Sequence, residues 1–359
     1  MKTIVLHDYF ESLEGGGRLC YLLAKGLGTD IGWGFARPNH PFVTPFINDH
    51  TACHDLGAYS FIPLWKQLKL ARAFSKRTDF LQDYQSVVYS GFYSPLAVHA
   101  HQTGKNILYC HTPPRFVYDQ RTFYLDRLPI GSRSLLQAFI DYLQPRYEAA
   151  IDKMDVIVAN SKEIRKRIHT YLGKESEVIY PPCDTHRFSW RGQGNYYLSM
   201  GRLDPLKQVD KVVQAFLHMP DKPLVVTSGG PELGRLKALA KGAPHISFTG
   251  WIDDDKLAAL VGNAIATIYV PKNEDFGMSP LESMAAGKPV IGVAQGGLVE
   301  TIIPEETGIL ISSQVNVDAI YKAVQILTPR CALGMRLACE EQAKRFRVER
   351  FLEQMQALL

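Results

Sequence analysis

The sequence predicts an α/β protein made of two domains, each with a parallel sheet covered by helices on both faces. Short apolar segments alternate with longer amphipathic segments along the chain, a pattern typical of such sheets. The length of 359 residues is long for one domain. Pro181 and Pro182 interrupt the alternation, which then restarts, so we place a boundary there. We expect domains over 1–183 and 184–347, followed by a last segment over 348–359.

The individual elements follow from the same alternation. In the first half, buried strands are expected at 4–6, 86–89, 106–109, 155–158 and 177–180, and helices over 134–150 and 162–172. In the second half, strands are expected at 196–200, 224–226, 245–249, 264–270 and 289–293, and helices over 209–216, 233–240, 254–261, 316–327 and 333–346.

Composition excludes several classes of protein. Hydrophobic residues make up 46% and charged residues 21%, as in ordinary globular proteins. A net charge of +4 is too weak to indicate a nucleic-acid partner, but it suits an anionic ligand. Six cysteines without a C-x-x-C pair indicate a reduced compartment. The N-terminus lacks the pattern of a signal peptide, and no apolar run has the length of a spanning helix. We therefore expect a cytoplasmic protein, at most resting on the inner face of a membrane.

A strand, a loop and a helix follow one another from residue 264 to residue 287. Gly277 lies in the loop, Ser279 is expected to cap the helix, and Pro280 is expected at its first position. Ligands of open α/β sheets bind at this edge, and a helix N-terminus binds anions. The stretch therefore predicts a phosphate site.

Glu274 and Glu282 flank this loop, where they could accept hydrogen bonds from ligand hydroxyls. Alternatively, Glu282 completes a capping box with Ser279, and Glu274 is a solvated loop acid. Arg202 and Lys207 follow the strand at 196–200 and together suit a diphosphate, although two solvated cations are the plainer interpretation of that pair alone.

The first half contains weaker candidates. The run 15–17 is three glycines between a strand and a helix, which can hold an anion on backbone N–H groups or serve only as a flexible turn. It is not the dinucleotide fingerprint. His111 follows the strand at 106–109 and is either a binding residue or a satisfied core histidine. His7, at the end of the first strand, is expected to be structural.

The segment 61–77 is basic and amphipathic. It could lie on an anionic bilayer, but a helix packed on the core with a solvated basic face is the commoner case. No group of His, Cys, Asp and Glu has the spacing of a metal site, and no Asp-x-Asp follows a strand, so we expect neither a metal nor a cofactor.

Two strings together resemble a known family. Glu274-Asp-Phe-Gly-Met-Ser-Pro-Leu-Glu282, continued by Ala-Ala-Gly-Lys-Pro-Val-Ile, is similar to the Glu-x7-Glu signature of retaining GT-B glycosyltransferases of family 4. Gly201-Arg-Leu-Asp-Pro-Leu-Lys207 resembles the phosphate clamp of the same family. The resemblance covers nearly the whole chain and is most specific from 201 to 300. It implies two Rossmann-like domains facing each other across a cleft, with the last helix crossing back to the first domain.

The resemblance also implies roles for individual residues. Arg202, Lys207 and the N–H groups of Met278 and Ser279 would hold the diphosphate of a nucleotide sugar. Glu282 would bind the ribose, and Glu274 the sugar hydroxyls. His111 would contact the donor sugar, so His111, Glu274, Arg202 and Lys207 are the expected catalytic group. The other expected donor-binding residues are Gly16, Gly17, Gly250, Trp251, Ile252, Phe276 and Gly277.

The donor and acceptor are less specific expectations. The strings Tyr-Cys-His-Thr-Pro-Pro-Arg and Asn-Glu-Asp-Phe-Gly look most like mannosyltransferases of bacterial O-antigen and exopolysaccharide assembly, which use GDP-mannose. The implied acceptor is a glycan or a polyprenyl-diphosphate-linked sugar, and the implied chemistry retains the anomeric configuration without a metal. A UDP-sugar donor, a non-catalytic GT-B scaffold subunit and a GT-B sugar-nucleotide epimerase are the alternatives, and the intact Arg202, Lys207, Glu274 and Glu282 argue against the scaffold.

Overall fold

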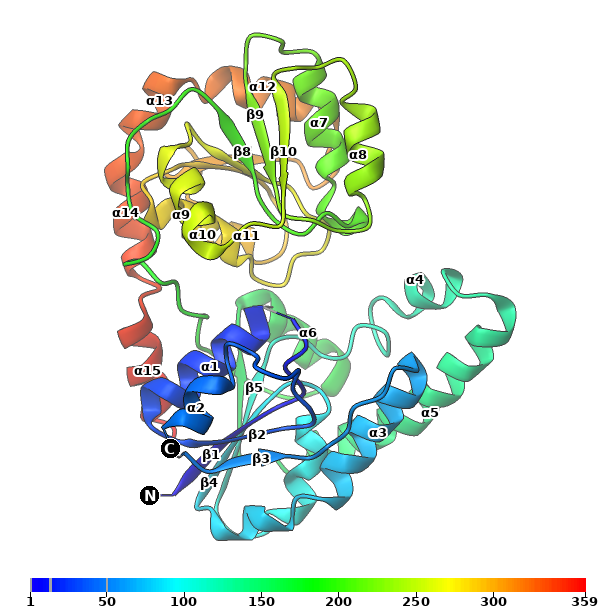
Figure 1. Ribbon diagram of the computed structural model, residues 1–359. Coiled ribbons are helices and arrows are strands. Elements are labelled where there is room, and N and C mark those ends of the chain that lie inside the picture. The colour runs from blue at the N-terminus through cyan, green and yellow to red at the C-terminus, as the bar shows by residue number, and fades with distance from the viewer. Residues whose placement is uncertain (1, 13–14, 50) are drawn as a thin grey trace. The chain divides into compact units, whose positions relative to one another are not determined.

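The computed structural model describes residues 2–12, 15–49 and 51–359, and the chain divides into two compact units (Figure 1). The N-terminal unit comprises Met1–Tyr180 and Phe351–Leu359, and the C-terminal unit comprises Pro181–Arg350. Each unit is a doubly wound α/β sheet, as the alternation predicts. The boundaries expected from the sequence lie a few residues from these.

The N-terminal unit contains a parallel sheet in the order β3-β2-β1-β4-β5-β6-β7. Its strands are β1 (Thr3–His7), β2 (Asp30–Trp33), β3 (Cys53–Asp55), β4 (Ser86–Ser90), β5 (Lys105–Cys110), β6 (Val156–Ala159) and β7 (Glu177–Val178). The order reverses direction between β1 and β4, and ligands of doubly wound sheets bind outside the carboxyl ends of the strands at such a point.

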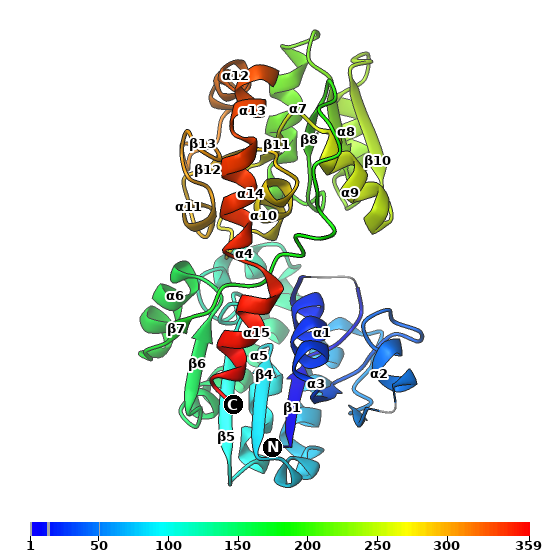
Figure 2. The same cartoon turned by 90° about the vertical axis from the view of Figure 1, so that its left-hand side faces the viewer.

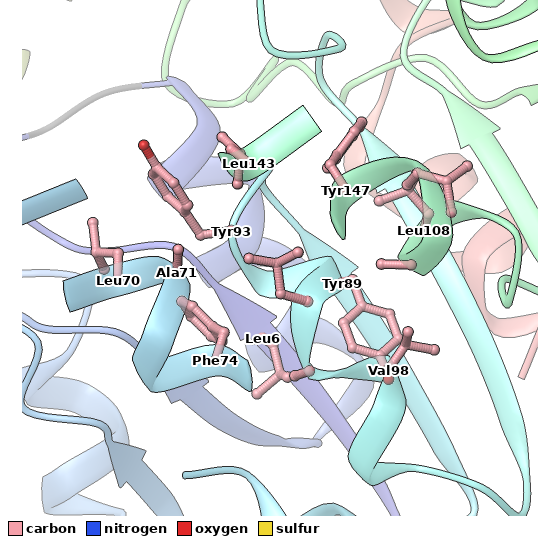
Figure 3. Packing of buried hydrophobic residues seen from close by; sticks show 14 of the residues in the cluster. Leu6, Leu70, Ala71, Phe74, Tyr89, Tyr93, Val98, Leu108, Leu143 and Tyr147 are labelled. Atoms are coloured by element: carbon pink, nitrogen blue, oxygen red, sulfur yellow. The ribbon is translucent and has the colours of Figure 1, made fainter. Parts of the chain in front are cut away.

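Helices cover both faces of this sheet. They are α1 (Gly15–Leu27), α2 (Thr44–Asn48), α3 (Pro63–Lys76), α4 (Arg121–Asp126), α5 (Ile130–Ile151), α6 (Lys162–Leu172) and α15 (Val348–Gln356), with 3₁₀ turns η1 (Asp79–Asp83) and η2 (Ser94–Ala100). On one face Leu6 of β1 packs in a core with Leu70 and Phe74 of α3 (Figure 3). On the other face, Phe351 and Met355 of α15 join the core under α1, and Figure 2 shows α15 lying beside α1.

The C-terminal unit has a second parallel sheet in the order β10-β9-β8-β11-β12-β13, which reverses between β8 and β11. Its strands are β8 (Tyr197–Ser199), β9 (Leu224–Thr227), β10 (Ile246–Gly250), β11 (Thr267–Tyr269), β12 (Val290–Val293) and β13 (Gly308–Ile311). Its helices are η3 (Pro205–Lys207), α7 (Val209–Leu217), α8 (Leu233–Leu239), α9 (Asp254–Asn263), α10 (Met278–Ala285), α11 (Leu298–Thr301), α12 (Val317–Ile326), α13 (Pro329–Gly334) and α14 (Arg336–Lys344).

Two kinds of element differ from the sequence prediction. The strands β2, β3 and β13 were not expected, because each has only three or four residues and none carries a clear period. The helix expected over 333–346 is instead two helices, α13 and α14. Thr328 caps the first by accepting a hydrogen bond from the N–H of Cys331 at 3.2 Å, so that helix begins earlier than expected.

Candidate functional site

The two sequence motifs of the C-terminal unit follow the two strands that flank its switch point. The segment Gly201–Lys207 follows β8, and the loop 270–277 follows β11. Two hydrogen bonds tie the loops together. The N–H of Lys272 donates to the carbonyl oxygen of Leu206 at 2.7 Å, and the side-chain amide of Gln208 donates to the carbonyl oxygen of Val270 at 3.1 Å. The strand order thus explains why segments some 70 residues apart form one edge.

Lys207, Tyr269 and Glu274 form a hydrogen-bonded group at this edge. The Nζ of Lys207 donates to the Tyr269 hydroxyl and to Oε2 of Glu274, both at 2.7 Å, and the Tyr269 hydroxyl donates to the same carboxylate oxygen at 2.9 Å. The side chains of Lys207 and Glu274 are only 23% and 18% exposed. A cation and a carboxylate expected to serve different parts of one donor therefore contact each other directly.

The electrostatics of this group keep the cation charged. Burial lowers the pKa of Lys207, but the hydroxyl of Tyr269 and the carboxylate of Glu274 outweigh it, so the pKa of Lys207 lies above its usual value. Burial, together with the Glu274 carboxylate, raises the pKa of the Tyr269 hydroxyl. At neutral pH the group is an ammonium bridged to a carboxylate by direct contact and through a neutral phenol.

Arg202 lies on the same loop but is more open to solvent. Its side chain is 58% exposed, and its Nε lies 3.2 Å from Oδ2 of Asp204. The other carboxylate oxygen of Asp204 accepts from the N–H of Leu206 at 2.9 Å and thereby caps the 3₁₀ turn that ends at Lys207. Asp204 thus fixes the turn that carries Lys207 and orients Arg202.

The helix α10 begins at Met278, two residues earlier than expected. Its N-cap is Gly277, whose φ of +89° is in the left-handed region that favours glycine, and no side chain caps this helix end. The predicted capping box of Ser279 and Glu282 is therefore wrong, because Ser279 lies within the first turn. Pro280 is tolerated there, since the first-turn N–H groups have no partner within the helix. The N–H groups of Met278 and Ser279 open this helix, where an anion is favoured.

Glycines of the next loop hold the Glu274 loop in place. A Cβ at Gly296 would lie 2.1 Å from the carbonyl oxygen of Glu274, and one at Gly297 would lie 2.3 Å from the Cα of Phe276. The N–H of Gly297 donates to the carbonyl oxygen of Glu274 at 3.3 Å. Phe276 itself is buried against Phe346, so only its backbone is available to a donor.

The remaining predicted residues of this unit lie at the end of β10. Gly250 ends the strand with a φ of +68°, and the indole of Trp251, 71% exposed, packs so closely on Gly229 that a Cβ there would lie 2.4 Å from its Nε1. The carbonyl of Gly229 accepts a hydrogen bond from the N–H of Leu203 at 2.9 Å. Gly250, Trp251 and the following Ile252 are thus connected through Gly229 to the loop of Arg202.

In the N-terminal unit, the predicted residues His111, Gly16 and Gly17 line one cavity of about 180 Å³. This cavity lies at the switch point between β1 and β4, and His7, Asp8, Glu11 and Phe92 also line it. We call it the polar cavity after its imidazole and carboxylate side chains. The Nε2 of His111 is hydrogen-bonded to the Ser90 hydroxyl at 2.9 Å. The glycines that were expected to form a turn before the helix are the first residues of α1 itself. A Cβ at Gly16 would lie 3.8 Å from the rings of His111 and His7, so the beginning of α1 packs against both imidazoles.

His7 belongs to this cavity, although the sequence suggested only a structural role. Its Nδ1–H donates to the carbonyl oxygen of Ser90 at 2.7 Å, which leaves Nε2 as the acceptor of the neutral ring. Burial lowers the pKa of His7 to about 4 and that of His111 to about 3, and each shift is increased by a nearby histidine. Both rings are therefore neutral at physiological pH and can exchange hydrogen bonds with ligand hydroxyls.

Asp8 is a buried carboxylate that shapes the same cavity. It accepts hydrogen bonds from the N–H groups of Phe92, Tyr93 and Ser94 at 2.8–2.9 Å, and so caps the 3₁₀ turn η2. Burial nevertheless raises the pKa of Asp8 to about 6, against the effect of these bonds. A Cβ at Gly91 would lie 2.2 Å from Oδ1 of Asp8, so a glycine is needed beside the carboxylate.

The sequence motifs missed Tyr269, Asp204 and His7. Tyr269 is the last residue of β11, where a polar group at a strand's carboxyl end was an available signal. His7 has the same signal at the end of β1. Among residues 2–12, 15–49 and 51–359, no three His, Cys, Asp or Glu side chains are placed to share a metal ion.

A doubly wound sheet with a cation and a carboxylate at its switch point, beside a helix N-terminus, has the chemistry that suits a phosphorylated ligand rich in hydroxyl groups. Residues 184–346 match the family described as Glycosyl transferases group 1. These residues make up most of the C-terminal unit. Over 99% of both chains, the structure is similar to HepE of Anabaena, solved in complex with UDP, with a TM-score of 0.74 and 16% identity. The chain thus has the GT-B fold.

Two curated relatives extend these matches. The chain is 26% identical to alpha-1,3/1,6-mannosyltransferase ALG2 of Dictyostelium discoideum, over 57% of this chain and 58% of that protein. It is 28% identical to a GDP-mannose-dependent alpha-(1-6)-phosphatidylinositol dimannoside mannosyltransferase of Mycobacterium tuberculosis, over 63% of this chain and 62% of that protein. The chain spans about half the length of the curated relatives it matches.

Proposed function

We propose that the protein is a retaining glycosyltransferase that moves a hexose from a nucleotide diphosphate sugar to a glycan or a lipid-linked sugar in polysaccharide assembly. The observation that carries this proposal is the contact of Lys207 with Glu274 beside the N-terminus of α10. A diphosphate needs positive charge, and sugar hydroxyls need strong acceptors. This edge of the C-terminal sheet offers both within one hydrogen-bonded group.

Each residue has a defined part in the proposed transfer. Lys207, Arg202 and the N–H groups of Met278 and Ser279 bind the diphosphate, and they stabilise the negative charge that develops on it as the glycosidic bond breaks. Glu274 accepts hydrogen bonds from the sugar. This positive charge comes from the protein itself, so we expect activity to persist in the presence of a chelator.

Glu282 accepts hydrogen bonds from the ribose hydroxyls in this proposal. We assign His111 a positioning role, since its neutral ring can exchange a hydrogen bond with a hydroxyl but is a weak base. We expect the transfer to retain the anomeric configuration.

GDP-mannose is the donor that we favour. The relatives ALG2 and the phosphatidylinositol dimannoside enzyme are mannosyltransferases by name, and the second is named as GDP-mannose-dependent. A UDP-sugar is the second candidate, because HepE, which has the same fold, was solved with UDP.

The donor can be tested by binding and turnover. Calorimetric titration with GDP, UDP and ADP should give the tightest binding for GDP, and radiolabelled GDP-mannose should be hydrolysed or used faster than UDP-glucose. Lys207→Met should weaken nucleotide binding, whereas Lys256→Met, which alters a lysine 72% exposed in the same unit, should not. Nucleotide binding without hydrolysis or transfer from any sugar nucleotide would favour a non-catalytic subunit instead.

A further inference from the structure

A second, larger cavity in the N-terminal unit is almost entirely apolar. It has a volume of about 550 Å³, within the size range of small-molecule sites, and is lined by residues from the beginning of α3, from α4 and from the beginning of α5. Its lining includes Ile62, Leu64, Tyr124, Leu135 and Phe139. We call it the apolar cavity.

The rim of the apolar cavity is unusual for a surface in water. The exposed fractions are 65% for Ile62 and 62% for Leu135, and Phe61, which precedes Ile62, is 87% exposed. Large apolar side chains that gather in this way mark a binding surface rather than ordinary solvent-facing residues. Gln67 also lines the cavity, and its buried Oε1 has no hydrogen-bond partner. A hydroxyl-rich ligand would find few partners here, whereas a hydrocarbon chain would bury the rim.

The apolar cavity adjoins the polar cavity of His7 and His111. Phe92 lines both. Two consecutive residues of α3 also lie on opposite sides of the boundary between the two cavities. The Nζ of Lys66 donates to Glu11, a residue of the polar cavity, at 2.8 Å, while Gln67 lines the apolar cavity. One ligand can therefore place a polar head at one cavity and an apolar tail in the other.

Positive charge is concentrated at this boundary. Lys66 is 17% exposed, and Arg37 lies 3.8 Å from the other carboxylate oxygen of Glu11. These two cations share the carboxylate of Glu11, so the three side chains together carry a net charge of +1. Lys69, Arg72 and Lys76 continue the basic side of α3. Such a boundary is complementary to the phosphate that links the head and tail of many lipids.

We propose that the acceptor is a lipid whose hydrocarbon chain occupies the apolar cavity, with its phosphate at Lys66 and its sugar hydroxyl in the polar cavity. This inference rests on the proposed transferase function and narrows its acceptor to the lipid-linked class. It also divides segment 61–77 between two roles. Leu70 and Phe74 anchor α3 in the core, and the beginning of the helix contacts lipid.

The binding test uses farnesyl phosphate, a single isoprenoid chain with a phosphate, below the concentration at which it forms micelles. Isopentenyl phosphate carries the same head on a much shorter chain. Calorimetry on the full chain should give at least tenfold tighter binding of farnesyl phosphate. Leu135→Glu places a charge on the exposed rim, and Ser132→Phe fills the cavity from the same helix. Each substitution should weaken the binding of farnesyl phosphate at least tenfold.

Matched controls separate the cavity from its surroundings. Ile130→Glu changes an exposed residue of the same helix outside the lining and should leave farnesyl phosphate binding unchanged. Circular dichroism and GDP or UDP titration should show that every variant is folded and retains the nucleotide site. Because the nucleotide titration is independent, a failure of the transferase proposal is distinguishable from a failure of the lipid site.

Three results would overturn the proposal. Equal binding of farnesyl and isopentenyl phosphates would mean that only the phosphate is recognised. Unchanged binding by both Leu135→Glu and Ser132→Phe would place the chain elsewhere. Binding to anionic phosphatidylglycerol vesicles, without binding of monomeric farnesyl phosphate, would mean that the apolar rim contacts a bilayer and that the cavity holds no chain.

Discussion

The ammonium of Lys207 lies 2.7 Å from the carboxylate of Glu274, although the two residues are 67 positions apart in the chain. Each is the principal counter-charge of the other at the end of the C-terminal sheet. A diphosphate that binds to Lys207 must therefore share the cation with Glu274, and a sugar that binds to Glu274 must share the carboxylate with Lys207. The two halves of the proposed donor are coupled through this ion pair.

The first prediction concerns this pair. Lys207→Met should weaken nucleoside diphosphate binding by about 1.5–3 kcal/mol, the usual loss for a charge-assisted contact. Glu274→Gln should instead lower kcat more than donor affinity, since charge develops next to the sugar during transfer. Calorimetry and steady-state kinetics on the single and double variants would measure both effects. Strict additivity of the two changes would show that the residues act independently.

The second prediction concerns Glu282. Because α10 is capped by Gly277 and Ser279 lies inside the helix, Glu282 has no capping box to complete. Glu282→Gln should therefore leave the melting temperature nearly unchanged and reduce nucleoside diphosphate affinity, since a carboxylate accepts stronger hydrogen bonds than an amide. A variant that loses stability but keeps its affinity would assign Glu282 to the helix and not to the ligand.

Strand order explains how much of this site was predictable. The motifs around Lys207 and Glu274 were visible because the two whole strings resemble the signature of one family, although each charge alone had a plainer explanation as a solvated side chain or a helix cap. Tyr269 had only the weak signal of a polar group at the carboxyl end of a strand, because a tyrosine there also fits the end of a buried strand. The direct contact of Lys207 with Glu274 depends on β8 and β11 being neighbours, which local pattern does not specify.

The features that the sequence did not predict depend on packing between segments that are distant in the chain. The apolar cavity joins α3 to α4 and α5, and the sequence showed only that 61–77 is amphipathic. The expected helix over 134–150 begins earlier, at Ile130, so the exposed Ile130 belongs to the helix. His7 lies in the site because β1 pairs with β4, and this pairing places the carbonyl of Ser90 beside the His7 ring. Such contacts are set by tertiary structure and leave no local period.

The third prediction tests the support of the Glu274 loop. Gly296 has a φ of +59°, and a Cβ there would lie 2.1 Å from the carbonyl oxygen of Glu274. Gly296→Ala should destabilise the protein by about 1–3 kcal/mol through backbone strain alone, and more if the loop moves. The rate of donor turnover should fall together with the stability. Gly234→Ala is the matched control, because a Cβ there meets nothing within 4 Å and lies in α8, where alanine is favoured by up to about 1 kcal/mol.

The last prediction concerns acid. Burial places the folded-state pKa of His7 at about 4 and of His111 at about 3, below the ordinary 6.5, so the unfolded chain binds up to two more protons as the pH falls. Asp8 has the opposite effect. Its folded-state pKa of about 6 lies above its ordinary 3.8, so at this carboxylate the folded state binds one proton more than the unfolded chain.

The net difference is about one proton, so the N-terminal unit should lose roughly 1.4 kcal/mol of unfolding free energy per pH unit between pH 6 and pH 4. Asp8→Asn removes the carboxylate whose proton uptake opposes that of the histidines, so the unfolding free energy should fall more steeply as the pH falls. The same substitution also weakens the cap of η2. His7→Gln should make the unfolding free energy less dependent on pH. Hydrogen exchange of peptides from β1 and β4, measured at several urea concentrations, would report the unfolding free energy of the N-terminal unit alone. A slope that is the same in all three proteins would mean that other groups control the acid sensitivity.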